Sequence, residues 1–188
     1  SDLLHSLGIN LNFAPICDVS TDSADYMYQR TFGQNGEMTA QYVWTVVTEM
    51  EKKRMGSVLK HFPGYGNNPD GHEAQVRDER SMETFINSDF LPFQAGIAAG
   101  ADCVLVSHNT VVCMDEEFPA SLSPEVHRIL REDLGFNGVI VTDDLSMKGI
   151  TDFAGDEEVA VLAVEAGNDL LCSTNFEVQI PAVIQAVM

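Results

Sequence analysis

Basic residues are scarce in this sequence, which holds 10 Lys and Arg against 29 Asp and Glu and carries a formal net charge of −19. Such a protein repels a polyphosphate backbone, so nucleic acid is not an expected partner. Long hydrophobic runs are also missing, because none approaches the roughly 18 apolar residues of a membrane span. No basic segment followed by an apolar stretch marks a signal peptide. We therefore expect no membrane partner.

Cysteine is sparse, and no Cys-x-x-Cys pair offers the spacing of a zinc site or a redox motif. Isolated thiols of this kind are typical of small buried side chains rather than of a disulfide framework. Free thiols favour a reducing compartment, so we expect a cytoplasmic protein. The sequence begins at Ser1 and ends at Met188 within a helix-like run, so we expect both ends to be cut. The cysteines are Cys17, Cys103, Cys113 and Cys172.

Short apolar runs alternate with longer stretches of helical spacing, which indicates parallel strands joined by helices. Ser123 followed by Pro124 is a typical helix start, and Gly135 and Gly167 are typical helix ends. The absence of a repeat or linker predicts a single domain over residues 1–188. The expected strands are Ile9–Asp18, Ser57–Phe62, Cys103–His108, Gly138–Asp144 and Leu170–Ser173. The expected helices are Met38–Arg54, Ser81–Ala99, Pro124–Leu134, Asp156–Ala166 and Phe176 to the end.

Polar residues end several of these strands, where parallel α/β folds collect their functional groups. No Gly-x-Gly-x-x-Gly follows the first strand, which argues against a nucleotide-binding open sheet and favours a barrel. Only about five of the eight βα units of a complete barrel can be counted. We therefore predict the α/β class, as a partial (β/α)8 TIM barrel that lacks its first strands and its last. The strand-end residues are Asp18, His61, His108 and Asp143.

A loop rich in glycine and proline follows the second expected strand. Residues 60–66 read KHFPGYG, and Asp70-Gly71-His72 comes soon after. His72 can act as a general acid or base because its ordinary pKa lies near working pH, and Asp70 can orient the ring. The alternative is an Asx turn with an exposed histidine, which is common in such loops.

Paired carboxylates end a later expected strand, in the segment GVIVTDDLSM at residues 138–147. A carboxylate at this strand end can attack the anomeric carbon of a sugar, which makes Asp143 a candidate nucleophile. Successive strand residues point in opposite directions, so Asp143 and Asp144 cannot both face one site. Either residue is alternatively a helix cap.

These segments resemble glycoside hydrolase family 3, and the match covers nearly the whole chain. Residues 60–66 are similar to the family's Lys-His-Phe-Pro-Gly-His-Gly signature, and residues 70–72 resemble the Asp-Ser/Thr-His pair of its N-acetylglucosaminidase branch. Residues 142–147 are similar to its Ser-Asp-Asp-Leu-Ser-Met nucleophile segment. Tyr65 departs from the family's second histidine, and the spacer 67–69 is one residue shorter than the common form. NFAP at 12–15 with Asp18, RTFG at 30–33 and LGFNG at 134–138 also match in order.

The resemblance implies a retaining β-N-acetylhexosaminidase that removes terminal N-acetylglucosamine from a small saccharide of the peptidoglycan or chitin type, without metal or cofactor. Asp143 would be the nucleophile that forms a glycosyl-enzyme, and His72, oriented by Asp70, would be the acid/base. A histidine in place of a second carboxylate does not repel an anionic acceptor such as phosphate. Phosphorolysis therefore stays open as an alternative reaction. By the same matching, the residues that would bind the sugar hydroxyls are Asp18, Arg30, Lys60 and His61.

Two interpretations from other classes stay open. Histidines and a carboxylate at strand ends are also the ligands of zinc-dependent barrel hydrolases, although no His-x-His follows the first strand. An unclosed barrel can instead be a non-catalytic sugar-binding or structural piece, and a homo-oligomer would complete its open sheet. The residues of the metal alternative are His61, His72, His108 and Asp143.

The candidate sugar-binding residues have structural alternatives too. Asp18 can simply end a strand, Arg30 can pair with a surface acid, and residues 60–61 can form an internal network at a strand end. His108 is assigned a supporting rather than a catalytic role. His127 falls on a helical stretch and is expected to be structural.

Overall fold

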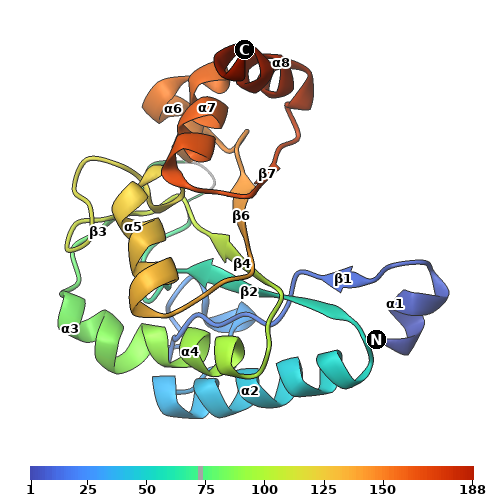
Figure 1. Ribbon diagram of the computed structural model, residues 1–188. Coiled ribbons are helices and arrows are strands. Elements are labelled where there is room, and N and C mark those ends of the chain that lie inside the picture. Colours follow the sequence, from blue (N-terminus) through green and yellow to red (C-terminus); the bar gives the residue numbers. More distant parts are fainter. Residues whose placement is uncertain (72–73) are drawn as a thin grey trace. The chain divides into compact units, whose positions relative to one another are not determined.

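The computed structural model describes residues 1–71 and 74–188 and shows a mixed α/β fold (Figure 1). The chain divides into two compact units. The first combines Ser1–Asn67 with Met82–Leu105, and the second combines Asn68–Ser81 with Val106–Met188. The α/β class predicted from the sequence is confirmed, while a single domain over residues 1–188 stays a prediction. Within the described ranges, no helix has both the length and the hydropathy needed to cross a membrane.

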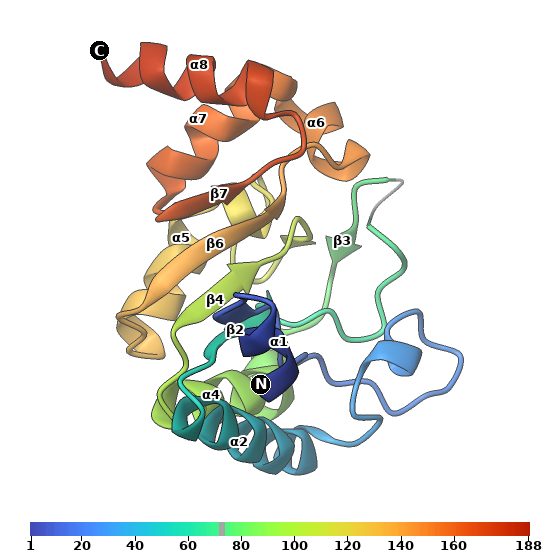
Figure 2. The same ribbon diagram turned by 90° about the vertical axis from the view of Figure 1, so that its right-hand side faces the viewer.

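The first unit places strands and helices in alternation. Strand β1 (Leu11–Asn12) pairs in parallel with β2 (Gly56–Phe62), and β4 (Cys103–Val106) lies on the other side of β2. Helices α2 and α4 pack against each other and run side by side in Figures 1 and 2. The helices are α1 (Asp2–Ser6), α2 (Gly36–Lys52), α3 (Met82–Thr84) and α4 (Phe90–Ala98), with a 3-10 turn at Tyr28–Arg30 and a π-helical turn at Phe85–Asp89.

The core of the first unit holds β2 close to these helices. A Cβ on Gly96 of α4 would come within 2.6 Å of the Leu59 side chain and 3.0 Å of Val43, so glycine permits the close approach of helix and strand. Phe62 at the end of β2 is fully buried, with its ring centroid 5.1 Å from that of Phe93. This packing stabilises the carboxyl end of β2, where the candidate residues lie.

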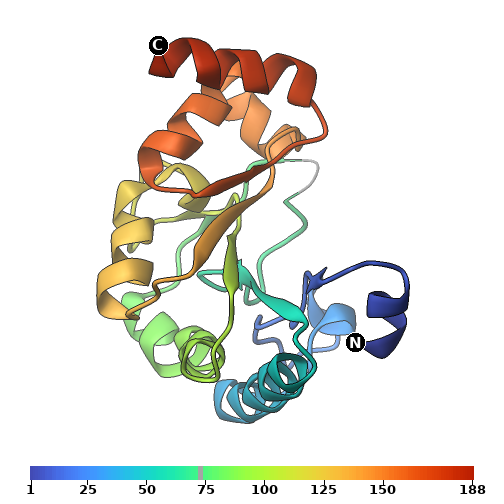
Figure 3. The same ribbon diagram turned by 45° about the vertical axis from the view of Figure 1, so that its right-hand side comes forward.

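The second unit contains two pairs of parallel strands. Strand β6 (Val139–Asp144) pairs with β7 (Leu170–Cys172), and the two lie side by side in Figures 2 and 3. Strand β3 (Arg77–Asp78) pairs with β5 (Thr110–Val111). The helical elements are α5 (Pro124–Arg128), α6 (Lys148–Ala154), α7 (Asp156–Ala166) and α8 (Phe176–Val187), with a 3-10 turn at Ala120–Leu122 and a π-helical turn at Ile129–Asp133.

An apolar cluster anchors the end of β6 in the second unit. Leu145 directly follows the two carboxylates and is fully buried. Helices α7 and α8 pack together on the same side of β7 (Figure 3). Because the residue after the acidic pair is held in the core, the pair itself is kept at the edge of the packed interior. The cluster consists of Leu122, Leu145, Ile150, Val159, Ala160 and Ala163.

Two predicted elements differ from the structure. The strand expected over Ile9–Asp18 is shortened to β1, because Pro15 has no amide hydrogen to donate, although the chain still follows β2 through an isolated bridge from Ile16 to Lys60. The helical stretch expected over Ser81–Ala99 is present from Met82 to Ala98, but it contains a π-helical turn at Phe85–Asp89 between α3 and α4.

Candidate active site

A buried hydrogen-bond network lies at the carboxyl end of β2. Asp18 is 1% exposed, and its Oδ2 lies 2.7 Å from Nδ1 of His61 and accepts from the His61 amide at 3.2 Å. Its Oδ1 accepts from the Tyr65 amide at 2.7 Å. A single carboxylate therefore orients the His61 ring and holds the loop that follows β2.

Tyr65 stands where the family resemblance places a second histidine. Its ring lies edge-on to His61 at a centroid distance of 6.1 Å and contacts the ring of Tyr26. Gly64 has φ +124, and a Cβ there would lie 2.5 Å from the buried carboxylate of Asp89. The loop is thus stabilised by a backbone hydrogen bond to Asp18 and by close packing on Asp89.

Arg30 and Lys60 complete the predicted sugar-binding set. Arg30 ends the 3-10 turn, is exposed, and lies with Nη1 3.6 Å from Sδ of buried Met27. Lys60 is half-buried on β2, and its carbonyl accepts from the Cys17 amide at 2.6 Å. Asp18, His61 and Lys60 therefore lie on two adjacent segments of the first unit. Their role in sugar binding stays a prediction.

The adjacent carboxylates at the end of β6 have different surroundings. Asp144 Oδ1 accepts from the Ser146 amide at 3.0 Å, the Ser146 hydroxyl at 2.6 Å and the Thr174 amide at 3.0 Å. Partial burial raises the pKa of Asp144, but these hydrogen bonds outweigh it and hold the pKa below its ordinary value. Asp143 is half-buried, and its Oδ1 accepts from the Asp144 amide at 2.9 Å. Asp144 thus links the ends of β6 and β7, whereas Asp143 retains acceptor capacity for another group.

The buried carboxylate of Asp78 joins the two ends of the loop that carries Asp70. Asp78 is fully buried and binds Arg80 through Nε at 3.0 Å and Nη2 at 2.7 Å. Asn68 donates to the same carboxylate at 2.7 Å. The contact from Asn68 therefore brings the two ends of the loop together, and Asp70 between them is half-buried. His72, the predicted acid/base, lies outside the described residues.

Helix α6 contacts the same loop. A Cβ on Gly149 would lie 2.5 Å from the carbonyl oxygen of Gly71 and 2.9 Å from that of Ala74. Only glycine therefore allows the helix that follows β6 to approach this backbone so closely. Asp143 lies six residues before Gly149 in the sequence.

His108 lies two residues after the end of β4 and is 6% exposed. Its ring contacts Ser121 and the backbone of Asp144, and its supporting role stays a prediction. In the part of the chain that the structure describes, no group of three or more His, Cys, Asp or Glu side chains is arranged to hold a metal ion. The predicted metal alternative included His72, which falls outside that part.

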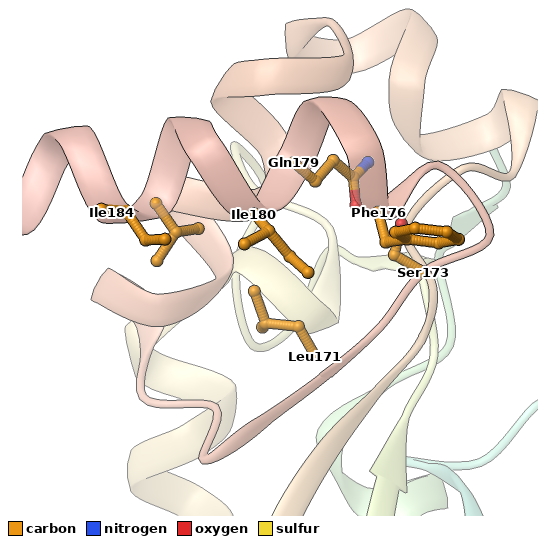
Figure 4. A pocket seen from close by; sticks show the side chains of 7 residues that line it. Leu171, Ser173, Phe176, Gln179, Ile180 and Ile184 are labelled. Carbon is orange, nitrogen blue, oxygen red and sulfur yellow. The ribbon is translucent and has the colours of Figure 1, made fainter.

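An apolar cavity of about 200 Å³ lies between β7 and α8 (Figure 4). Leu171, Ile180 and Ile184 form much of its wall, and Gln179 contributes its amide while donating to the Leu145 carbonyl at 3.0 Å. No charged side chain lines it. It therefore lacks the carboxylate and imidazole groups needed for glycosyl transfer.

Three structural contributors were missed at the sequence level. Asp78 looks like part of a solvated charge run in the segment RDER, yet it is fully buried. Gly149 follows the acidic segment at residues 142–147, and no pattern in the neighbouring sequence indicates that it contacts the backbone of residues 71 and 74. The engagement of Asp144 by Thr174 depends on a residue 30 positions away. The alternation of strand side chains predicted that Asp143 and Asp144 face different sites, but it did not identify the partners of Asp144.

The comparisons with known proteins agree with these motifs. The chain is 34% identical over 166 residues to a β-hexosaminidase of Stenotrophomonas maltophilia, covering 87% of this chain and 49% of that protein. It superposes on a family 3 β-N-acetylglucosaminidase from Paenibacillus with a TM-score of 0.90 at 36% identity, covering 98% of this chain and 36% of that one. A β-glucoside phosphorylase matches with a TM-score of 0.90 at 25% identity, over 97% of this chain and 35% of that one.

The chain spans about half the length of the curated relatives it matches. Residues 2–188 match the description "Glycosyl hydrolase family 3 N terminal domain". This match covers the network at Asp18, the loop after β2 and the acidic pair of β6. The chain therefore belongs to glycosyl hydrolase family 3.

Proposed function

We propose that the protein containing this chain is a retaining β-N-acetylglucosaminidase that removes terminal β-linked N-acetylglucosamine from peptidoglycan-type or chitin-type saccharides. The observation that carries the proposal is the division between two neighbouring carboxylates. Asp144 is engaged by three hydrogen-bond donors, which leaves Asp143 as the carboxylate suited to nucleophilic attack. Relatives named β-hexosaminidase and a structure titled as a family 3 β-N-acetylglucosaminidase support the same activity.

The proposed reaction has two steps. In the first, a carboxylate oxygen of Asp143 bonds to the anomeric carbon, the glycosidic C–O bond breaks, and the leaving oxygen takes a proton from His72. In the second, a water oxygen attacks the same carbon, passes a proton to His72, and the bond to Asp143 breaks. Asp70 stabilises the cationic form of His72. Protonation states are restored after each turnover.

We assign recognition of the sugar hydroxyls to Asp18, Arg30, Lys60 and His61, on the basis of the family motifs. The buried contact between Asp18 and His61 supports a role for Asp18 in fixing the ring of His61. A preoriented ring loses less conformational entropy when it binds a ligand than a free one does. The partial (β/α)8 barrel remains our proposal for the architecture, supported by the match to the Paenibacillus structure.

We also propose a cytoplasmic protein. The four cysteines are free thiols, which are typical of proteins in a reducing compartment. Fractionation of the source cells, with the protein recovered in the soluble cytosol or outside it, tests this assignment.

A phosphorylase is the second candidate. The structural match to a β-glucoside phosphorylase favours it, because an acid/base histidine does not repel a phosphate dianion as a carboxylate would. In that reaction a phosphate oxygen replaces water as the group that attacks the glycosyl-enzyme. The product is then a sugar phosphate rather than the free sugar.

Hydrolysis of an aryl β-N-acetylglucosaminide by the full-length protein, with and without inorganic phosphate, tests both candidates. We expect free N-acetylglucosamine at a rate independent of phosphate, and much slower cleavage of the plain β-glucoside. Preference for the glucoside would refute the N-acetylglucosaminidase assignment. A sugar phosphate formed only with phosphate would replace hydrolysis by phosphorolysis.

A further inference from the structure

His108 forms hydrogen bonds to two different segments of the second unit. Its Nδ1 lies 2.8 Å from the hydroxyl of Ser121, and its Nε2 lies 3.1 Å from the carbonyl oxygen of Asp144. The imidazole is almost fully buried, and the ring bridges the 3-10 turn that contains Ser121 to the end of β6. A buried side chain with two fixed partners has little freedom to rotate.

The partners determine where the ring carries its hydrogen. A carbonyl oxygen can only accept, so Nε2 of His108 must donate to Asp144. The Ser121 hydroxyl can either donate to an unprotonated Nδ1 or accept from a protonated one, so Nδ1 can keep this contact in both states.

Asp144 connects His108 to the candidate nucleophile Asp143. The amide of Asp144 donates to Oδ1 of Asp143 at 2.9 Å, while the carbonyl of Asp144 accepts from His108. The Asp144 carboxylate accepts from Ser146 and Thr174, and its carbonyl also accepts from the Met147 amide at 3.0 Å. The amide, the carbonyl and Oδ1 of Asp144 are thus all engaged, which fixes the peptide that donates to Asp143.

We propose that His108 is a positioning residue for the Asp143 nucleophile, which holds the backbone of Asp144 by donating from Nε2 to its carbonyl oxygen. This inference rests on the proposed function, because it concerns how Asp143 is aimed. His108 does not exchange protons with the substrate. Its contribution is to keep the carboxylate of Asp143 in the geometry required to attack the anomeric carbon.

The test uses His108→Ala and His108→Gln in the full-length protein. Alanine removes the donor to Asp144, and we expect kcat/KM to fall on the order of 10²-fold, since small misplacements of reacting groups have effects of this size. Glutamine carries an amide that can donate to Asp144 and an oxygen that can accept from Ser121. We therefore expect His108→Gln to recover most of the loss and to keep the wild-type pH profile.

Two aryl N-acetylglucosaminides, one with an activated and one with a poor leaving group, distinguish positioning of the nucleophile from an acid/base defect. Departure of an activated group needs little protonation, so loss of acid catalysis affects mainly the poor leaving group. A misplaced Asp143 slows attack on both substrates. We expect His108→Ala to reduce kcat/KM by similar factors for the two, with unchanged inhibition by free N-acetylglucosamine.

His127→Ala is the matched control. His127 is also buried in the second unit and also binds a backbone carbonyl, that of Ser123 at 2.8 Å. We expect it to lower the thermal midpoint without the loss of kcat/KM. If His108→Ala does not fold, His108→Gln and Ser121→Ala carry the same comparison, with a smaller loss expected from Ser121→Ala on both substrates.

The proposal is overturned if folded His108→Ala retains kcat/KM within about threefold, a factor below that expected for misplacement. A loss confined to the poor leaving group, or one that His127→Ala reproduces, also overturns it. Asp143→Ala in the same assay tests the proposed function separately. If Asp143→Ala stays active, the nucleophile assignment fails, whatever the result for His108.

Discussion

Replacing each of the two adjacent carboxylates by alanine separates catalysis from stability. We expect Asp143→Ala to lower hydrolysis of an aryl β-N-acetylglucosaminide on the order of 10⁴-fold or more, the scale at which loss of a nucleophile acts in other hydrolases. We expect Asp144→Ala to retain more activity and to lose more stability. Both changes remove the same atoms from neighbouring positions of one strand, so each variant is the control of the other.

The magnitudes follow from the hydrogen bonds. Asp144 accepts from two donors of Ser146 and from the Thr174 amide, and each bond to a charged acceptor contributes about 1.5–3 kcal/mol when well buried. Because Asp144 is half-exposed, water replaces part of this, and we expect a loss of about 2–4 kcal/mol in the free energy of unfolding. Asp143 accepts from one amide, and its removal costs about 0.5–1.5 kcal/mol.

The assay pairs initial rates with the thermal midpoint of each full-length variant. Near-complete loss of activity in Asp143→Ala with a midpoint near wild type supports the division of roles. The reverse pattern, with activity abolished in folded Asp144→Ala and retained in Asp143→Ala, would show that the second carboxylate is the nucleophile.

Three further results are expected. The pKa of Asp144 lies below its ordinary value of 3.8, so its contribution to stability is complete above about pH 4 and is lost as pH falls through the lower folded-state pKa. We therefore expect the thermal midpoint to fall less steeply with decreasing pH in Asp144→Ala than in wild type. Equal slopes would refute this prediction. Burial, followed by the charge of Asp18, raises the pKa of Cys17, so iodoacetamide at pH 8 should leave Cys17 unlabelled in native protein and label it after unfolding, as read by mass spectrometry. Gly149→Ala should gain about 1 kcal/mol from helix propensity but lose about 1–3 kcal/mol because its methyl group overlaps the carbonyls of residues 71 and 74. We therefore expect urea unfolding to show a less stable protein. A more stable variant would contradict the close contact.

Local chemistry was readable from the sequence where a few adjacent residues determine it. Ser123 caps α5 by accepting from the Val126 amide at 3.2 Å, as the Ser-Pro pair predicts. Gly167 ends α7 with φ +112, a conformation that glycine adopts without strain. The apolar run before Asp143 forms a strand because both of its faces are covered. The helix cap and the helix end depend on a few adjacent residues, whereas the strand also depends on the packing that covers its faces.

The features that sequence reasoning missed are two short strands and a π-helical turn inside a predicted helical stretch. Strands β3 and β5 have two residues each, too few to show a period, and they exist because they pair with each other. The helix over residues 81–99 was predicted from continuous helical spacing, which does not register a π-helical turn. Both the short strands and the π-helical turn depend on the folded chain rather than on the local sequence pattern.

The sequence alone determined the residue types of the candidate site, their order and the family to which the chain belongs. Tertiary structure decided which of those groups are already engaged. Asp18 accepts from residues 43 and 47 positions away, and Asp144 accepts from Thr174 across the pair β6 and β7. A hydrogen bond requires two atoms within about 3 Å, and only the folded chain brings such distant groups together.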